Sequence, residues 1–312
     1  MQMVCFHINF ILLRTKNYII KPMNLCEKTG LVLEGGGFRA IYVAAVLEAL
    51  HRNQLFFPYA IGVSAGAAYG VSYVTMQNGR NLLTNSRISD KQYCGLSHWI
   101  KKGDFFHWEY VYKTIPTQII PLDYQALAQS STHFQVAMTN CLSAEVEYVD
   151  ANTSDPDKMR DLLTATSSLP YVAKMKFING VPYLDGGLAD PVPVHHALEM
   201  GNNRVVVVLT RPKGYQKEPS KTQWLFRLIY KKYPKLIRLM ETREQHYNKL
   251  IKDIESLETR GQAFIIRPKE PVSIGRLENN PQHLEKVYTK TLQMIDPTIQ
   301  ELKKWLANPI TK

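Results

Sequence analysis

The chain has 312 residues, 45% of them hydrophobic, so it can bury the core of one large domain or of a domain with an appended subdomain. This composition excludes a disordered protein. Its 38 Lys and Arg residues outnumber its 27 Asp and Glu residues, which gives a formal net charge of +11. That excess favours an anionic partner, such as nucleic acid, a phospholipid surface or an acidic substrate, without choosing among them.

The N-terminal segment shows an apolar run at residues 4–13 (VCFHINFILL). A run of about ten residues is too short to span a bilayer, which takes roughly twenty. Basic residues follow the run instead of preceding it, and no small-residue cleavage site comes after, so it does not have the pattern of a signal peptide. We interpret residues 1–27 as an extension outside the core, with Met23 as an alternative initiator.

The cysteines carry no metal or disulfide signal. The four cysteines are Cys5, Cys26, Cys94 and Cys141. They form no CxxC pair, and their spacing to the histidines does not match that of metal ligands. We therefore expect free thiols in a reducing compartment and a cytoplasmic protein, peripheral to the membrane if it contacts one.

Two α/β units open the core. Residues 29–34 (TGLVLE) predict a buried strand, three glycines interrupt it, and residues 38–53 have helical periodicity. A second strand at 56–63 (FFPYAIGV) and a helix of small residues at 64–77 follow directly. Two strands joined by such a helix are expected to lie parallel.

Residues 85–130 are irregular and rich in aromatic side chains. The segment is interpreted either as a subsidiary core or as a lipid-facing lid, and packing into a core is the expected outcome for most large apolar residues.

The second half of the core returns to regular patterns. Strands are predicted at 134–141 and 144–151, a helix at 159–170, and a hairpin turning at Asn179–Gly180. The run RVVVVLT at 204–210 is typical of a buried parallel strand.

The character changes after Thr210. Residues 211–238 hold nine basic residues against the single acid Glu218, interleaved with aromatic and aliphatic side chains. The stretch is interpreted as a solvated helix packed on the main sheet or as a contact with an anionic membrane surface. Helices near 240–259 and 281–307 are predicted to flank a strand, AFIIRP. The predicted organisation is an extension at 1–27, a core at 28–210 and a basic, mainly helical region at 211–312.

A glycine run, LEGGGFRA at residues 33–40, stands between the first strand and its helix. Such a run aims successive N–H groups at one point beside the positive end of a helix, which suits an anion. It also fits the loose dinucleotide pattern G-x-G-x-x-G/A. That pattern needs an acidic residue about twenty positions later, and the second strand offers none, so no cofactor is expected.

The pentapeptide Gly62–Val63–Ser64–Ala65–Gly66 matches G-x-S-x-G, a nucleophile elbow in which serine projects from a strand-to-helix turn. A serine nucleophile needs a base. The residues leave two kinds of base open: a histidine, with His195 and His196 as candidates, or directly Asp185 on its glycine turn.

At this point the chain resembles the patatin-like phospholipases, serine lipid acyl hydrolases with a Ser–Asp dyad. Three motifs carry the resemblance in the family's order: GGGFRA as oxyanion loop, GVSAG as elbow and DGG as the dyad aspartate. The stretch TATSSLPYVAKMKFINGVPYLDGGLADPVPVHHALEMG also follows the family, and the resemblance covers residues 29–210.

The resemblance implies Ser64 as nucleophile and Asp185 as base. It assigns the backbone N–H groups of Gly35, Gly36 and Gly37 to the oxyanion hole, and supporting roles to Arg39, Gly62, Gly66, Gly186 and Gly187. It implies a three-layer α/β/α fold with a mainly parallel sheet, and no cofactor or metal. Two positions depart from the family pattern: Ala40 replaces a glycine, and Asp190–Pro191 stand where asparagine is common.

The expected function is hydrolysis of lipid esters, of the phospholipase A, lysophospholipase or carboxylesterase type. The alternatives are a Ser–His–Asp esterase and a catalytically weak module that binds membranes or anions through 211–238. No nucleic-acid partner is expected, because no binding motif is recognisable. Asp150, Asp155 and Asp157 lack the spacing of a calcium loop and are interpreted as loop and cap residues.

Overall fold

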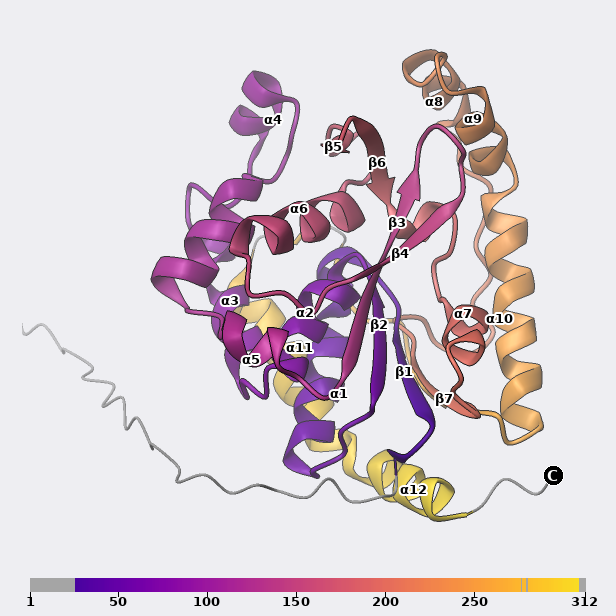
Figure 1. Cartoon of the computed structure of the whole chain (residues 1–312). Helices are drawn as coiled ribbons and strands as arrows, with labels where there is room; N and C mark the ends of the chain where they lie inside the picture. Colours follow the sequence, from indigo (N-terminus) through magenta and orange to yellow (C-terminus); the bar gives the residue numbers. More distant parts are fainter. Residues whose placement is uncertain (1–25, 276, 279, 309–312) are drawn as a thin grey trace, which may run out of the picture.

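The computed structural model describes residues 26–275, 277–278 and 280–308, so the apolar run at 4–13 and Met23 lie outside the described residues. An eight-stranded sheet crosses the middle of the molecule (Figure 1). Its five parallel strands run in the order β3-β2-β1-β7-β8: His133–Asn140, Tyr59–Val63, Thr29–Leu33, Arg204–Val208 and Ala263–Ile266. The mainly parallel sheet predicted from the sequence is confirmed.

Three further strands join the sheet around β3 through antiparallel pairs. Both β4 (Val146–Asp150) and β6 (Val181–Asp185) pair with β3, and β5 (Lys176–Ile178) pairs with β6. The turn between β5 and β6 has φ 50° at Asn179 and φ 80° at Gly180. This is the left-handed backbone that an Asn-Gly turn favours, so the predicted hairpin is confirmed.

The central strands are rich in apolar residues because both faces of the sheet are covered. Leu31 and Leu33 of β1 point into one core, and Val32 between them points into the other. The first core includes residues of α1 (Ile41–Arg52), α2 (Ala65–Val74), α6 (Pro156–Ser167) and α11 (Pro281–Met294). The second includes residues of α7 (Val194–Glu199) and α10 (Arg243–Thr259), which lie on the opposite side in Figure 1.

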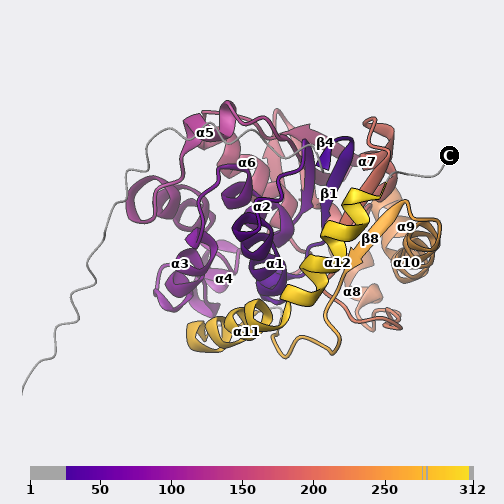
Figure 2. The same cartoon turned by 90° about the horizontal axis from the view of Figure 1, so that it is seen from below.

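The C-terminal region takes part in the main fold. Strand β8 pairs in parallel with β7, and α11 packs on α1. The single helix predicted over 281–307 is wrong: it is divided into α11 and α12 (Asp296–Ala307) at Ile295. Pro297 causes the division, because it has no N–H to donate to a preceding turn and is tolerated only in the first turn of a new helix. Figure 2 shows α12 crossing the lower end of the sheet.

The aromatic segment at 85–130 is mostly core, as expected. It contains α4 (Leu96–Lys102), the π-helical segment η4 (Tyr110–Ile119) and α5 (Tyr124–Ala128), after α3 (Arg80–Ser86). Its buried apolar residues join the first core: Ile88, Tyr93, Tyr110, Ile115, Leu122 and Leu127. Helix α4 differs, because Leu96, Trp99 and Ile100 are exposed.

The basic stretch forms two short helices, α8 (Gln223–Ile229) and α9 (Pro234–Glu241). Phe226 and Leu236 are buried in a small cluster with Leu184 and Leu188, at the end of β6. The sequence predicted one helix packed on the main sheet, whereas the structure has two short helices that cover the end of β6 and its turn. Within the described ranges, no helix combines the length and apolarity that a membrane span requires.

Candidate active site

Ser64 lies at the turn between β2 and α2, with φ 54° and ψ −128°. This backbone costs a non-glycine residue on the order of 1–3 kcal/mol and recurs at functional turns. The flanking glycines are required by close contacts: a Cβ on Gly62 would stand 2.5 Å from the Ala67 Cα, and one on Gly66 would stand 2.6 Å from the Leu33 carbonyl oxygen. The predicted strand, sharp turn and helix around Ser64 are present.

Thr166 holds this turn from α6. Its hydroxyl accepts a hydrogen bond from the Ser64 N–H at 2.8 Å and donates one to the Ala137 carbonyl at 2.6 Å. Leaving a buried backbone group without its partner costs about 1–3 kcal/mol, so Thr166 offsets part of the strain at the serine. Sequence reasoning did not single out Thr166. The signal available was its place in TATSSLP, a run of small residues.

Asp185 is the last residue of β6 and is buried. It pairs with Met138 of β3, while Val63, just before the serine, pairs with the preceding β3 residue Ala137. Along β3, the His133 N–H bonds the Pro58 carbonyl beside β2, and the Cys141 N–H points to the same edge and bonds the Pro182 carbonyl of β6. Strand β6 therefore continues this edge where β2 ends, which brings Ser64 and Asp185 next to each other. The Asp185 Oδ1 accepts a hydrogen bond from the Gly187 N–H at 2.8 Å, which fixes the side chain over its own turn.

The glycine loop packs directly against the elbow. A Cβ on Gly35 would stand 2.8 Å from both the Ser64 Cβ and the Val63 carbonyl oxygen. Behind the loop, the buried Glu34 carboxylate accepts hydrogen bonds from the Thr210 N–H at 2.5 Å and from the Thr210 hydroxyl at 2.8 Å. It accepts a third at 2.8 Å from the Tyr247 hydroxyl of α10. Glu34 and Tyr247, which sequence reasoning missed, anchor the loop to the C-terminal region.

A polar pocket of about 70 Å³ brings the predicted residues together. Its lining includes Ser64, Asp185, Gly187, the loop Gly35–Gly37 and Arg39. The remaining supporting residue, Gly186, faces β3, where a Cβ would overlap the Ala137 carbonyl.

The two candidate histidines lie elsewhere. His195 and His196 are in the first turn of α7. The His196 Nε2 makes a 2.8 Å hydrogen bond with the Gln135 Oε1, and its ring stacks on Tyr148 at 3.6 Å. In the part of the chain that the structure describes, no histidine lines either pocket at Ser64.

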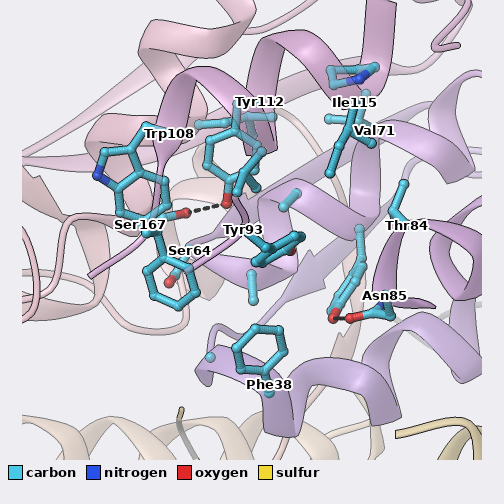
Figure 3. Close-up of a pocket in the computed structure, with 18 of the residues that line it drawn as sticks. Phe38, Ser64, Val71, Thr84, Asn85, Tyr93, Trp108, Tyr112, Ile115 and Ser167 are labelled. Atoms are coloured by element: carbon cyan, nitrogen blue, oxygen red, sulfur yellow. Dashed lines mark hydrogen bonds between the residues drawn. The ribbon is translucent and has the colours of Figure 1, made fainter. Parts of the chain in front are cut away.

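An apolar pocket of about 120 Å³ opens on the other side of Ser64 (Figure 3). Phe38, Tyr93, Trp108 and Tyr112 surround it near the serine. The Tyr112 hydroxyl is 2.9 Å from the Ser167 Oγ, and burial raises the pKa of Tyr112 to about 12, so the phenol stays neutral. The aromatic segment thus supplies much of the wall of this pocket.

The two departures from the family pattern are accommodated locally. Ala40 is buried in the helical segment η2 (Gly37–Ala40), a conformation open to alanine. Asp190 accepts a hydrogen bond from the Tyr148 hydroxyl at 2.7 Å, which ties the loop after the DGG turn to β4. Burial raises the pKa of Asp190, and the hydrogen bond from Tyr148 opposes that rise.

The remaining polar candidates have structural partners. Asp155 caps α6 by accepting from the Asp157 N–H, as expected. Asp150, interpreted from the sequence as a loop or cap residue, is instead the last residue of β4 and bonds His133 and Gln135 of β3. Across the described ranges, no group of three or more His, Cys, Asp or Glu side chains is arranged to hold a metal ion. Burial raises the pKa of the Cys26 and Cys94 thiols to about 11 and that of Cys141 to about 12.

Two family models match this chain. The family model described as patatin-like phospholipase matches residues 31–198, and a domain of unknown function, DUF6363, matches residues 233–307. The uncharacterized protein YjjU of Escherichia coli (strain K12) is 26% identical over 257 residues, which are 78% of this chain and 70% of YjjU. The crystal structure of VipD from Legionella pneumophila matches with a TM-score of 0.43 and 13% identity, over 86% of this chain and 67% of that one. The family match spans more than half of the chain, which therefore belongs to the patatin-like phospholipase family.

Proposed function

We propose that the protein is a serine lipid acyl hydrolase of the phospholipase A, lysophospholipase or carboxylesterase type. One observation carries the proposal: Ser64, Asp185 and Gly35–Gly37 line a single pocket. The adjoining apolar pocket suits an acyl chain, because its wall is mostly aromatic and aliphatic.

In the proposed reaction, Asp185 takes the proton of the Ser64 hydroxyl as the serine oxygen attacks the ester carbonyl. Negative charge then develops on the carbonyl oxygen, and N–H groups of the Gly35–Gly37 loop stabilise it. The C–O bond to the leaving alcohol breaks, and the alcohol takes back the proton. Water, activated by the same carboxylate, hydrolyses the acyl-serine to release the acid.

A fluorophosphonate probe tests the nucleophile. The wild-type protein should be labelled, because such probes phosphonylate an activated serine, and Ser64→Ala should lose the label completely. Ser86→Ala is a matched control, since the Ser86 hydroxyl is exposed on α3 and donates to the Leu83 carbonyl, away from both pockets. Equal labelling of wild type and Ser64→Ala, read by intact-protein mass spectrometry, would contradict the proposal.

We further propose that residues 211–238 contact an anionic membrane surface. Trp224, Leu228 and Ile229 of α8 are exposed, with basic residues around them. The exposed helix α4 projects at the same end of the molecule (Figure 1). Tyr171 links the two helices: its carbonyl accepts from the Trp99 Nε1 at 3.0 Å, and its hydroxyl donates to the Thr222 carbonyl at 2.9 Å.

Vesicle co-sedimentation tests this contact. The combined variant Trp224→Ser/Leu228→Ser/Ile229→Ser should bind phosphatidylglycerol vesicles at least about tenfold more weakly, since each buried apolar side chain contributes about 1.5–3 kcal/mol. Wild-type binding should also weaken with added salt. The control Met76→Ser/Leu83→Ser removes exposed apolar residues elsewhere. An equal loss in both variants, or no loss in the first, would overturn the contact.

A further inference from the structure

The cavity at Ser64 has two chemically different halves that share Gly37, Ser64 and Leu169. The first half is the apolar pocket. The second carries four cationic side chains, Arg39, Arg211, Lys217 and Arg243, against the two carboxylates of Glu34 and Asp185. The cationic excess lies beside the reacting serine.

The Glu34 carboxylate keeps its charge but is bound behind the glycine loop. Its two oxygens already accept hydrogen bonds from the Thr210 N–H, the Thr210 hydroxyl and the Tyr247 hydroxyl. Glu34 therefore serves the loop behind the pocket. Asp185 remains as the proposed base, and the rest of the charged lining is positive.

Three of these cations come from residues that follow the part matched by the patatin family model. The Arg211 guanidinium stacks over the Tyr215 ring at 4.3 Å, and the Lys217 Nζ lies over the Tyr247 ring at 4.7 Å. The Lys217 backbone is held to α10, because its N–H donates to the Asn248 Oδ1 at 2.8 Å and its carbonyl accepts from the Asn248 Nδ2 at 3.0 Å. These ring contacts and the backbone hydrogen bonds of Lys217 position the two cations before a ligand arrives.

Arg243 connects the same wall to the catalytic turn. Its Nε and Nη2 donate to the Gly187 carbonyl at 3.1 and 2.9 Å. The cationic wall and the Asp185–Gly187 turn are therefore one unit, built partly from the C-terminal region.

We propose that Arg211 and Lys217 form a subsite for the phosphate of a lipid headgroup. The inference rests on the proposed hydrolase function and assigns to Arg211 and Lys217 the selection, within it, of phosphate-bearing acyl esters over neutral ones. The ester carbonyl stands at Ser64, the acyl chain enters the apolar pocket and the phosphate binds Arg211 and Lys217. Charge-assisted hydrogen bonds from such groups to phosphate are about twice as strong as neutral ones.

Steady-state kinetics on two substrates with the same acyl chain, lysophosphatidylglycerol and a neutral monoacylglycerol, tests the subsite. In Arg211→Gln/Lys217→Gln, kcat/KM for the lysophospholipid should fall about 10- to 100-fold, the range expected when charge-assisted hydrogen bonds are lost. For the monoacylglycerol, kcat/KM of the same variant should stay within about twofold of the wild-type value, because that substrate carries no phosphate. Lys249→Gln/Lys252→Gln is the matched control, since it removes the same charge from exposed positions of α10.

Inorganic phosphate gives a readout independent of turnover. It should raise the Tm of the wild type and of the control, and not that of Arg211→Gln/Lys217→Gln. Equal loss on both substrates, or no loss on either, overturns the subsite. Loss of the phosphate-induced Tm shift without any change in substrate preference also overturns it, since the site would then hold free phosphate alone. If the wild type hydrolyses neither substrate, the proposed function itself fails.

Discussion

Replacing Asp185 with asparagine should lower kcat for ester hydrolysis by about 10²–10⁴-fold, the usual contribution of a general base. Asparagine keeps the shape of the side chain, and its amide oxygen can still accept from the Gly187 N–H, as the aspartate does at 2.8 Å. It cannot take the Ser64 proton. The fold should therefore survive, and the loss should appear in kcat measured with a soluble p-nitrophenyl ester.

The matched comparison is His195→Ala/His196→Ala. Both histidines lie on α7 and outside the residues that line the two pockets, so this variant should keep its turnover within a few-fold. A Ser–His–Asp mechanism predicts the opposite ranking. If the histidine variant is inactive and Asp185→Asn retains most of its activity, the dyad assignment is wrong.

Replacing Gly35 with alanine should reduce kcat by about 10²-fold or more, the effect of losing one oxyanion donor. The new Cβ would stand 2.8 Å from the Ser64 Cβ and from the Val63 carbonyl oxygen. Since one of these contacts is backbone, the loop has to move away from the serine, and its N–H groups leave the place where the oxyanion forms. We also expect a lower free energy of unfolding, because overpacking typically costs about 1–3 kcal/mol.

Gly36→Ala separates this effect from the mere addition of a methyl group. Its φ of 170° is open to any residue, and its Cβ would meet the Thr210 side chain at 3.1 Å, which is a milder contact. The fold-decrease in kcat should be several times smaller for Gly36→Ala than for Gly35→Ala. Equal losses in kcat, at equal folded fractions by circular dichroism, would show that the approach of Gly35 to the elbow is not what positions the loop.

Local patterns in the sequence determined most of the fold. Uninterrupted apolar runs such as 205–208 occur where both faces of a strand are buried, so they predicted the parallel strands. Asn179–Gly180 predicted its hairpin, because few other dipeptides accept two left-handed residues. The boundaries were less secure: the helix predicted to end near Pro170 ends at Ser167, and the helix over 281–307 is interrupted at Ile295.

The sequence alone also nominated Ser64, Asp185 and the Gly35–Gly37 loop, since each belongs to a short motif with its own backbone requirement. It could not exclude His195 and His196. Their distance from Ser64 depends on which face of the sheet α7 covers, and that is settled by packing in the second core.

Only the tertiary structure decided what surrounds these residues. Thr166, Glu34, Tyr247 and Arg243 act through contacts with residues far away in the chain, such as the Ser64 N–H and the Gly187 carbonyl. Long-range contacts of this kind leave no local periodicity or motif, because their partners are brought together only when the sheet and its two helical layers close. The sequence by itself thus nominated the residues of the candidate site, and the packing of the C-terminal region decided the shape and charge of the pocket around them.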